Sequence, residues 1–126
     1  MALLLFIDDE PDTLKTLEKA VQLLGHQALL AHNARQAYKL LDRYKPDLIF
    51  VDLQLGDIDG LNVVRMLRAP ANPAERVPVV ILSASPEVDV AARARQSGAQ
   101  DYLLKPLRLQ TLLETIEKFV PPMLVD

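Results

Sequence analysis

The sequence predicts an α/β protein in which a parallel, five-stranded sheet carries helices on both faces. Five short apolar runs recur along the 126 residues, and a segment with helical spacing of apolar residues follows each run. Runs without polar alternation are typical of strands buried on both faces, and strands that alternate with helices form right-handed crossovers. The expected strands cover residues 2–7, 27–31, 48–51, 79–82 and 101–104.

The first two helices are predicted by their end signals and by apolar residues three and four positions apart. Pro11 suits the first turn of the first helix, and Gly25 stops it. Asn33 is an N-cap residue for the second helix, and Pro46 ends it. The apolar faces consist of Leu14, Leu17, Val21 and Leu24, and of Ala34, Ala37, Tyr38 and Leu41.

Three further helices follow the remaining strands. A turn at Asp59-Gly60 precedes the third helix. Pro86 opens the fourth, which ends near Gly98, and Pro121 stops the fifth. The expected inner faces hold Leu61, Val64 and Leu67, then Val88, Ala91 and Ala92, then Leu109, Leu112, Leu113 and Ile116. Because alanine buries less apolar surface than leucine, the fourth helix is expected to be weakly anchored.

The composition is typical of one water-soluble domain. The formal net charge is −3 and no Lys/Arg block occurs, so a nucleic-acid-binding face is not expected. The absence of cysteine excludes disulfides and thiolate metal sites and fits a reducing compartment. No run approaches the ~20 apolar residues of a membrane span. We therefore expect a cytoplasmic protein that does not bind membranes.

Polar side chains follow the ends of four expected strands. They are Asp8 and Asp9, Asp52, Ser83, and Lys105. The carboxyl ends of parallel strands share one edge of the sheet, where open α/β folds bind ligands, so we expect these side chains to converge. Crowded carboxylates resist ionisation unless a cation joins them, and a hard divalent ion with oxygen ligands relieves the repulsion. Mg²⁺ is therefore the expected cofactor.

Four motifs at these strand ends resemble the receiver domains of bacterial two-component response regulators. They are Ile7-Asp8-Asp9-Glu10, Val51-Asp52-Leu53 with Asp59-Gly60, Leu82-Ser83-Ala84, and Asp101-Tyr102-Leu103-Leu104-Lys105-Pro106. The resemblance spans about Leu3 to Val120 and implies a doubly wound, flavodoxin-like fold with strand order 2-1-3-4-5. It implies a receiver domain over residues 1–120. The tail, 121–126, is either the start of a linker to an effector domain or the end of the natural chain.

The resemblance assigns the phosphoryl chemistry to Asp52. This carboxylate would receive a phosphoryl group from the phosphohistidine of a histidine kinase or a histidine phosphotransfer protein. By the same analogy, Asp9, Asp52 and the backbone carbonyl of Gln54 ligate Mg²⁺, and Asp8 acts mainly through water. Lys105 is expected to pair with Asp52 and then with the phosphoryl oxygens.

Further roles follow from the same resemblance. The Ser83 hydroxyl and the Ala84 amide would receive another phosphoryl oxygen, and a cis bond before Pro106 would aim Lys105 inward. Tyr102 would act as a rotameric switch toward an output surface made of the fourth helix, fifth strand and fifth helix. An effector domain or protein would bind there, and homodimerisation is also open. Such a module is not an enzyme for an external substrate, although it catalyses its own phosphotransfer and dephosphorylation.

Several neighbouring residues receive secondary interpretations. The family often has proline at the position of Gly56 and more commonly has threonine at that of Ser83. The resemblance also implies that Gln54 and Ser85 lie beside the phosphoryl site and influence how long the phosphoaspartate lasts. Loop or capping roles are expected for Glu10, Asp12, Asp57 and Asp59, and surface positions for His26 and His32.

Two alternative functions remain open at the level of sequence. A small Mg²⁺-dependent phosphatase or phosphotransferase would also use an aspartyl phosphate, but such enzymes typically carry an acid where this chain has Gln54. A flavodoxin-like flavin or nucleotide carrier needs a loop that cradles phosphate, whereas the turn after the first strand is acidic and lacks glycine. A flavin absorbance spectrum distinguishes the carrier from the others.

Overall fold

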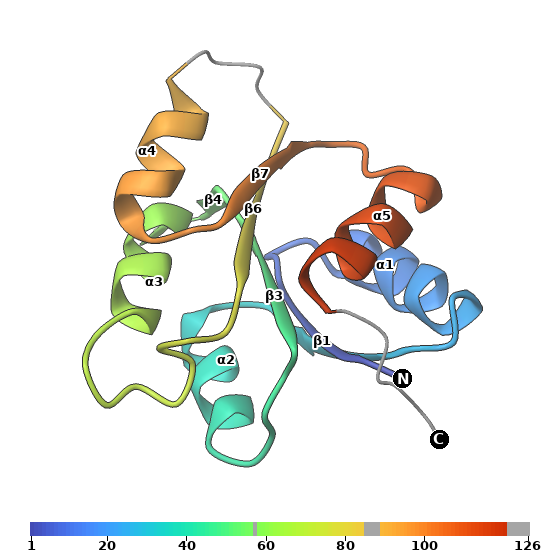
Figure 1. Cartoon of the computed structure of the whole chain (residues 1–126), viewed down its shortest axis with the longest axis horizontal. Coiled ribbons are helices and arrows are strands. Elements are labelled where there is room, and N and C mark those ends of the chain that lie inside the picture. The colour runs from blue at the N-terminus through green and yellow to red at the C-terminus, as the bar shows by residue number, and fades with distance from the viewer. Residues whose placement is uncertain (57, 85–88, 121–126) are drawn as a thin grey trace.

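The computed structural model describes residues 1–56, 58–84 and 89–120. Its main sheet contains β1 (Leu3–Ile7), β2 (Gln27–Ala31), β3 (Leu48–Asp52), β6 (Val79–Ser83) and β7 (Asp101–Leu104). The order across the sheet is β2-β1-β3-β6-β7, and all neighbouring strands are parallel. Counted along the chain, these five strands have the order 2-1-3-4-5, so the expected fold class is confirmed (Figure 1).

The helices form one layer on each face of this sheet. Helices α1 (Pro11–Leu23) and α5 (Leu109–Phe119) lie on one face, as Figure 1 shows. Helices α2 (Ala34–Leu41), α3 (Gly60–Leu67) and α4 (Val90–Ser97) lie on the other. The buried apolar side chains divide into two clusters in the same way. Since both faces are covered, every residue of β3 and of β6 is buried.

Most of the predicted helix ends are present. Asn33 Oδ1 accepts a hydrogen bond from the backbone N–H of Gln36 at 2.8 Å and caps α2. Asp59 Oδ1 accepts one from Leu61 N at 2.9 Å and caps α3, as expected for a capping acid. Helix α2 ends at Leu41, several residues before the proline that was expected to stop it.

The inner face of α4 differs from the prediction. The buried residues of this helix are Val90, Ala94 and Ser97. Ala91 is only half-buried and Ala92 is exposed, while Val88 and the expected start at Pro86 lie outside the described residues. Val90 is the one large apolar side chain between residues 89 and 98, so it decides which face turns inward. Apart from Val90, the buried residues of α4 are small, and none of them is a leucine.

The inner face of α5 was also predicted only in part. Its buried residues are Leu112, Thr115 and Ile116. Leu109, the first residue of the helix, is 48% exposed, and Leu113 is half-buried. Thr115 can be buried because its hydroxyl donates to Thr111 O at 2.7 Å within the helix. The spacing of apolar residues does not predict a buried polar residue whose hydrogen bond is made within the helix.

A short hairpin after β3 is absent from the sequence prediction. It pairs β4 (Gln54–Leu55) with β5 (Ile58–Asp59) in antiparallel fashion. Strands of two residues are too short to show a period of two. The turn contains Gly56 in the left-handed region, with φ of 72°. The hairpin therefore carries the chain from the end of β3 directly to α3.

Candidate functional site

The carboxyl ends of the strands bring the predicted site residues to one edge of the sheet. Asp52 and Ser83 are the last residues of β3 and β6, Asp8 follows β1, and Lys105 follows β7. The parallel registers end these strands at nearly the same level. The Lys105 backbone N–H also donates to Ser83 O at 2.7 Å. The convergence expected from the strand ends is therefore present.

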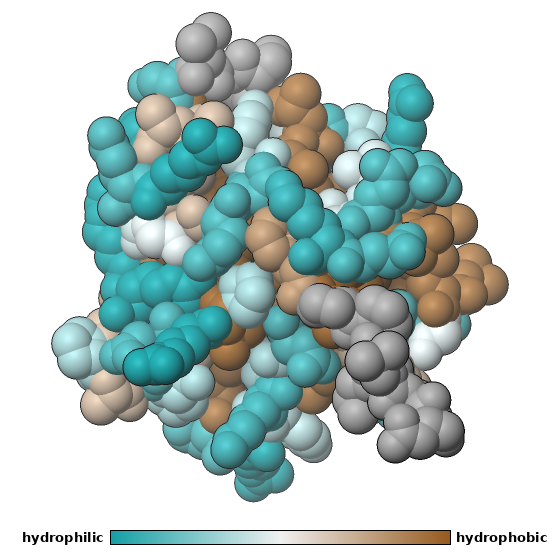
Figure 2. Space-filling model, viewed as in Figure 1, coloured by the Kyte–Doolittle hydropathy of each residue, from teal (hydrophilic) through white to brown (hydrophobic). Residues whose placement is uncertain are grey.

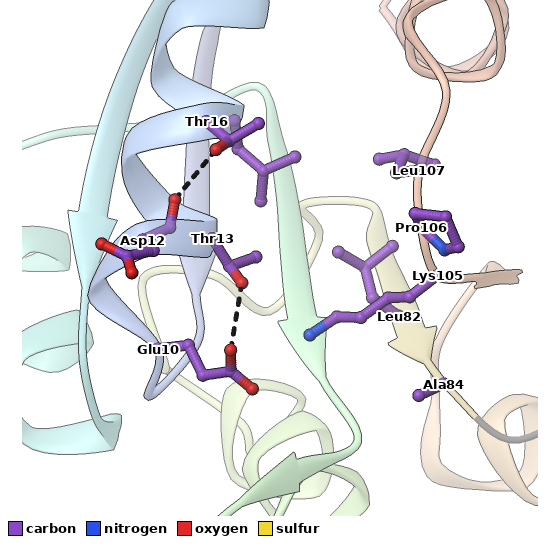
Figure 3. A pocket seen from close by; sticks show the side chains of 10 residues that line it. Glu10, Asp12, Thr13, Thr16, Leu82, Ala84, Lys105, Pro106 and Leu107 are labelled. Atoms are coloured by element: carbon purple, nitrogen blue, oxygen red, sulfur yellow. Dashed lines mark hydrogen bonds between the residues drawn. The ribbon is translucent and has the colours of Figure 1, made fainter.

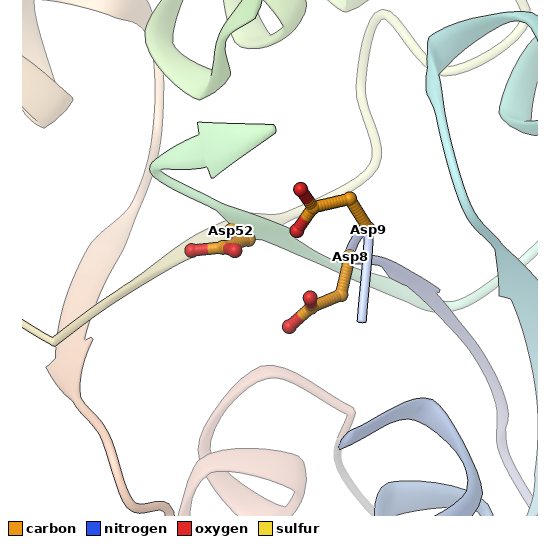
Figure 4. Close-up of side chains that lie close together, drawn as sticks. All are labelled: Asp8, Asp9 and Asp52. Carbon is orange, nitrogen blue, oxygen red and sulfur yellow. The ribbon is translucent and has the colours of Figure 1, made fainter. Parts of the chain in front are cut away.

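Three carboxylates form the centre of this edge. Asp8, Asp9 and Asp52 each offer an oxygen, and these oxygens all lie within 4.8 Å of one another (Figure 4). Asp8 and Asp52 are 1% and 7% exposed, whereas Asp9 is exposed. Oxygen ligands of octahedral Mg²⁺ lie about 2.1 Å from the ion, so opposite ligands are about 4.2 Å apart, which is close to the spacing of these carboxylate oxygens. The residues present thus fit a divalent cation held by oxygen ligands.

Lys105 is a positive charge inside this acidic group. Its Nζ lies 2.8 Å from Asp8 Oδ2 and 3.4 Å from Asp52 Oδ2. The expected pairing with Asp52 is present, but the shorter contact is with Asp8, whose second oxygen accepts from Glu10 N at 3.0 Å. The Lys105-Pro106 bond is cis, as expected. Both Asp8 oxygens are therefore engaged by the protein itself.

Burial and neighbouring charges shift the ionisation of this pair. Burial raises the pKa of Asp52, and the Asp8 charge raises it further, while Lys105 and the Gln54 N–H lower it. Burial alone would lower the pKa of Lys105, but its hydrogen bond to Asp8 and the charges of Asp52 and Asp8 outweigh this, so the pKa is raised. Lys105 therefore stays protonated beside an aspartate that is costly to ionise without a cation.

Gly60 fixes the peptide that carries Asp52, a role that the sequence analysis missed. The Gly60 N–H donates to Leu53 O at 2.7 Å. A Cβ at Gly60 would lie 2.2 Å from the Asp52 carbonyl oxygen and 2.9 Å from Leu53 Cα. Only a residue without a side chain lets α3 start this close to β3. The Asp59-Gly60 turn signal contained the residue, but the sequence gives no sign of this approach.

A pocket of about 470 Å³ opens beside the carboxylates, between the start of α1 and the segment after β7 (Figure 3). Glu10, Thr13 and Thr16 line its α1 side, and Lys105 and Pro106 line the other. Thr13 Oγ1 donates to Glu10 Oε2 at 3.5 Å. The pocket reaches Lys105 from the α1–α5 side of the sheet.

The remaining predicted residues lie around this edge. Ser83 is 2% exposed at the end of β6, and Ala84 is exposed and lines the pocket. Tyr102 is half-buried on β7 and packs against the cluster that faces α2, α3 and α4. Gln54 N donates to Asp52 Oδ1 at 3.3 Å, which places residue 54 beside the carboxylates. Ser85 and Asp57 lie outside the described residues.

The group of side chains that could hold a metal ion includes neither histidine. His32 is exposed, as predicted, while His26 is half-buried and its Nδ1 accepts a hydrogen bond from Ala2 N at 2.8 Å. The surface position expected for His26 is therefore only partly right, because a hydrogen bond to the N-terminal backbone leaves no pattern in the sequence. None of the helices in the described part of the chain has the length and apolar character that a membrane crossing requires.

Comparison with known proteins decides the family. A family model for the response regulator receiver domain matches residues 4–117. The chain belongs to this family. The match runs from β1 to α5 and includes every site residue described above. This membership supports the receiver interpretation over the phosphatase and the flavin carrier.

Curated relatives include both short and long receiver proteins. Protein PilH of Pseudomonas aeruginosa PAO1 is 32% identical over 116 residues, which is 92% of this chain and 95% of PilH. The transcriptional regulatory protein PrrA of Mycobacterium tuberculosis H37Rv is 35% identical over 113 residues. This alignment covers 90% of the present chain but only 47% of PrrA. The chain thus spans about half the length of PrrA.

Solved receiver structures have the same fold. A response regulator from Thermotoga maritima has a TM-score of 0.83 at 32% identity, over 97% of this chain and 99% of that one. The receiver domain of the sensor histidine kinase PA1611 from Pseudomonas aeruginosa PAO1 has a TM-score of 0.83 at 28% identity, over 96% and 98% of the two chains. That structure has a magnesium ion coordinated in its active site cleft.

Proposed function

We propose that this receiver takes a phosphoryl group onto Asp52 from the phosphohistidine of a histidine kinase or a histidine phosphotransfer protein. An Asp52 oxygen would bond to phosphorus as the bond between phosphorus and the histidine nitrogen breaks. The observation that carries the proposal is the group of three carboxylate oxygens within 4.8 Å of one another, with Lys105 Nζ in contact with two of these aspartates. The pocket beside Lys105 leaves room for the donor.

Asp9, Asp52 and the backbone carbonyl of Gln54 are the proposed direct ligands of Mg²⁺, and Asp8 is proposed to act through water. The engagement of both Asp8 oxygens by Lys105 and Glu10 supports this secondary role. When bound, Mg²⁺ would offset the charge that the phosphoryl oxygens bring to the carboxylates. The magnesium in the PA1611 receiver domain supports the choice of metal.

The other predicted residues are proposed to bind the phosphoryl oxygens. Lys105 would exchange its contact with Asp52 for one with a phosphoryl oxygen, which its short distance to Asp52 makes a small movement. The Ser83 hydroxyl and the Ala84 amide would bind another oxygen. Electrostatic stabilisation and positioning by such groups supply most of the catalysis in phosphoryl transfer.

The output is proposed to leave through α4, β7 and α5, with Tyr102 as the switch. The buried residues of α4 are Val90, Ala94 and Ser97, and the alanine and the serine bury less apolar surface than leucine would, which favours a shift of this helix. An effector domain or protein, or a second copy of the chain, would read this surface. The protein would act in the cytoplasm as a signalling module that dephosphorylates itself, and not as an enzyme for an external substrate.

Acetyl phosphate tests the phosphoacceptor. With Mg²⁺, it should add one phosphoryl mass that is labile to base, and chelation of the metal should prevent the addition. Asp52→Asn should abolish the addition, while Asp12→Asn, a change at an exposed acid on the rim of the pocket, should leave it intact. Labelling of Asp52→Asn at a site other than Asp8 or Asp9 would refute the assignment.

A further inference from the structure

Positive charge is concentrated on the α2–α3–α4 side of the sheet. Residues 34–45, 60–78 and 89–98 comprise α2 and α3 with the segments that follow them, and α4 with its two cap residues. They contain nine of the 14 Lys and Arg residues but only three of the 17 Asp and Glu residues. Their formal charge is therefore +6, and that of all other residues is −9. No basic run exists in the sequence because the cations are spaced along three helices and gather only in the fold.

Seven of these cations are exposed, and none of the seven forms an ion pair with a carboxylate of the described residues. This set, the basic layer, consists of Arg35, Lys39, Arg43, Lys45, Arg65, Arg76 and Arg95. Figure 2 shows hydrophilic side chains gathered over the region where Figure 1 places α2, α3 and α4. Unpaired exposed cations keep their full charge available to a partner, since no internal carboxylate must first be displaced.

An apolar pair lies within the basic layer. Tyr38 Oη donates to Met66 Sδ at 3.3 Å and joins α2 to α3. Met66 is 52% exposed, and each member of the pair has a cation of the layer next to it in sequence, Lys39 after Tyr38 and Arg65 before Met66. Tyrosine, methionine and arginine are enriched at protein interfaces, where an apolar centre is surrounded by a polar rim. A surface that binds its partner by charge alone would not need an exposed methionine at this place.

We propose that the basic layer is a docking surface for an acidic protein segment. The segment would place an apolar side chain on Tyr38 and Met66 and carboxylates over the surrounding cations. A long nucleic acid or a bilayer extends beyond the layer, so the −9 charge of the other residues repels it. A short acidic segment interacts mainly with the charges within a Debye length, about 8–10 Å, and these belong to the layer. Because the pocket beside Lys105 lies next to α1, on the other side of the sheet, both partners could bind together.

A labelled synthetic peptide of glutamate with leucine at every fourth position provides the probe. The fluorescence anisotropy of the peptide would be measured while the full chain is added, at low and at high salt. An all-glutamate peptide, a DNA duplex and phosphatidylserine vesicles would be measured in the same way for comparison. The test variant is Lys39→Glu/Lys45→Glu, and the matched control is Lys15→Glu/Lys19→Glu on α1, with the same change in charge. Both control lysines are exposed. Circular dichroism checks that each variant is folded.

The Glu/Leu peptide should bind at low salt, and binding should weaken as salt increases. The Lys39→Glu/Lys45→Glu variant should lose about tenfold in affinity and the α1 control less than about twofold. Met66→Gln should weaken the binding of the Glu/Leu peptide but leave the binding of the all-glutamate peptide unchanged. Equal losses in the two double variants, an absence of peptide binding, or tighter binding of DNA or vesicles to the same layer would overturn the proposal.

Discussion

Replacing Gly60 with alanine tests whether the start of α3 positions Asp52. The added Cβ would lie 2.2 Å from the Asp52 carbonyl oxygen and 3.0 Å from its carbonyl carbon. Ordinary contacts between non-bonded heavy atoms are about 3.5–4.0 Å, so the two backbone segments must separate by about 1 Å. The atoms that must move belong to backbone on both sides, and a side-chain rotation cannot relieve the contact.

The energetic cost follows from opposing effects. Overpacking costs about 1–3 kcal/mol, and the better helix propensity of alanine returns up to about 1 kcal/mol. We therefore expect Gly60→Ala to lower the free energy of unfolding by about 1–2 kcal/mol. Gly25→Ala is the control, because its φ of 84° imposes strain of about 1–2 kcal/mol while nothing lies within 4 Å of the added Cβ.

Urea unfolding with chelator and with increasing Mg²⁺ separates stability from site geometry. Mg²⁺ that binds only the folded state stabilises it according to its affinity. Both glycine variants should be destabilised without metal, but only Gly60→Ala should show a smaller gain with Mg²⁺. If the gain equals that of the wild type and of Gly25→Ala, then Gly60 supports the fold but does not position Asp52.

Three other predictions concern the carboxylates and α4. Asp52→Asn should raise the thermal midpoint without metal at pH 7, because burial raises the Asp52 pKa above its ordinary 3.8 and the folded state resists ionisation. This advantage should shrink as the pH falls through the folded pKa, where Asp52 becomes neutral; an advantage that grows toward acid would contradict the sign. Asp9→Ala should weaken Mg²⁺ binding about tenfold or more in calorimetry, whereas Asp12→Ala should not. Beryllofluoride should change amide exchange in α4 and β7, and changes confined to α1 and α2 would exclude the proposed output surface.

The sheet could be predicted because its strands are buried on both faces. The runs Leu48–Val51 and Val79–Leu82 contain only apolar residues, and no alternative element of this length explains them. The acidic site could be predicted for the same reason, since each polar residue stands where such a run ends. Strand order, by contrast, came from the family resemblance, because apolar runs do not encode which strand lies next to which.

The features that could not be predicted depend on contacts between distant residues. The buried face of α4 contains Val90, which is fully buried in the folded protein, and the helix itself offers little apolar periodicity. The short contact from Lys105 to Asp8 joins residues 97 positions apart. The approach of Gly60 to Asp52 depends on the β4–β5 hairpin, whose strands are too short to be recognised from sequence.

The position of Lys105 has a consequence for which ions the carboxylates can hold. Three ionised aspartates and one ammonium carry a formal charge of −2, so a single divalent cation makes the group electrically neutral. A monovalent ion would leave an uncompensated negative charge, and a trivalent ion would leave a positive one, in a place where two of the aspartates are buried. Lys105→Gln would shift this balance to −3 and make the vacant cluster less stable, while attracting cations more strongly. The lysine thereby makes the formal charge of the group equal and opposite to that of a divalent cation.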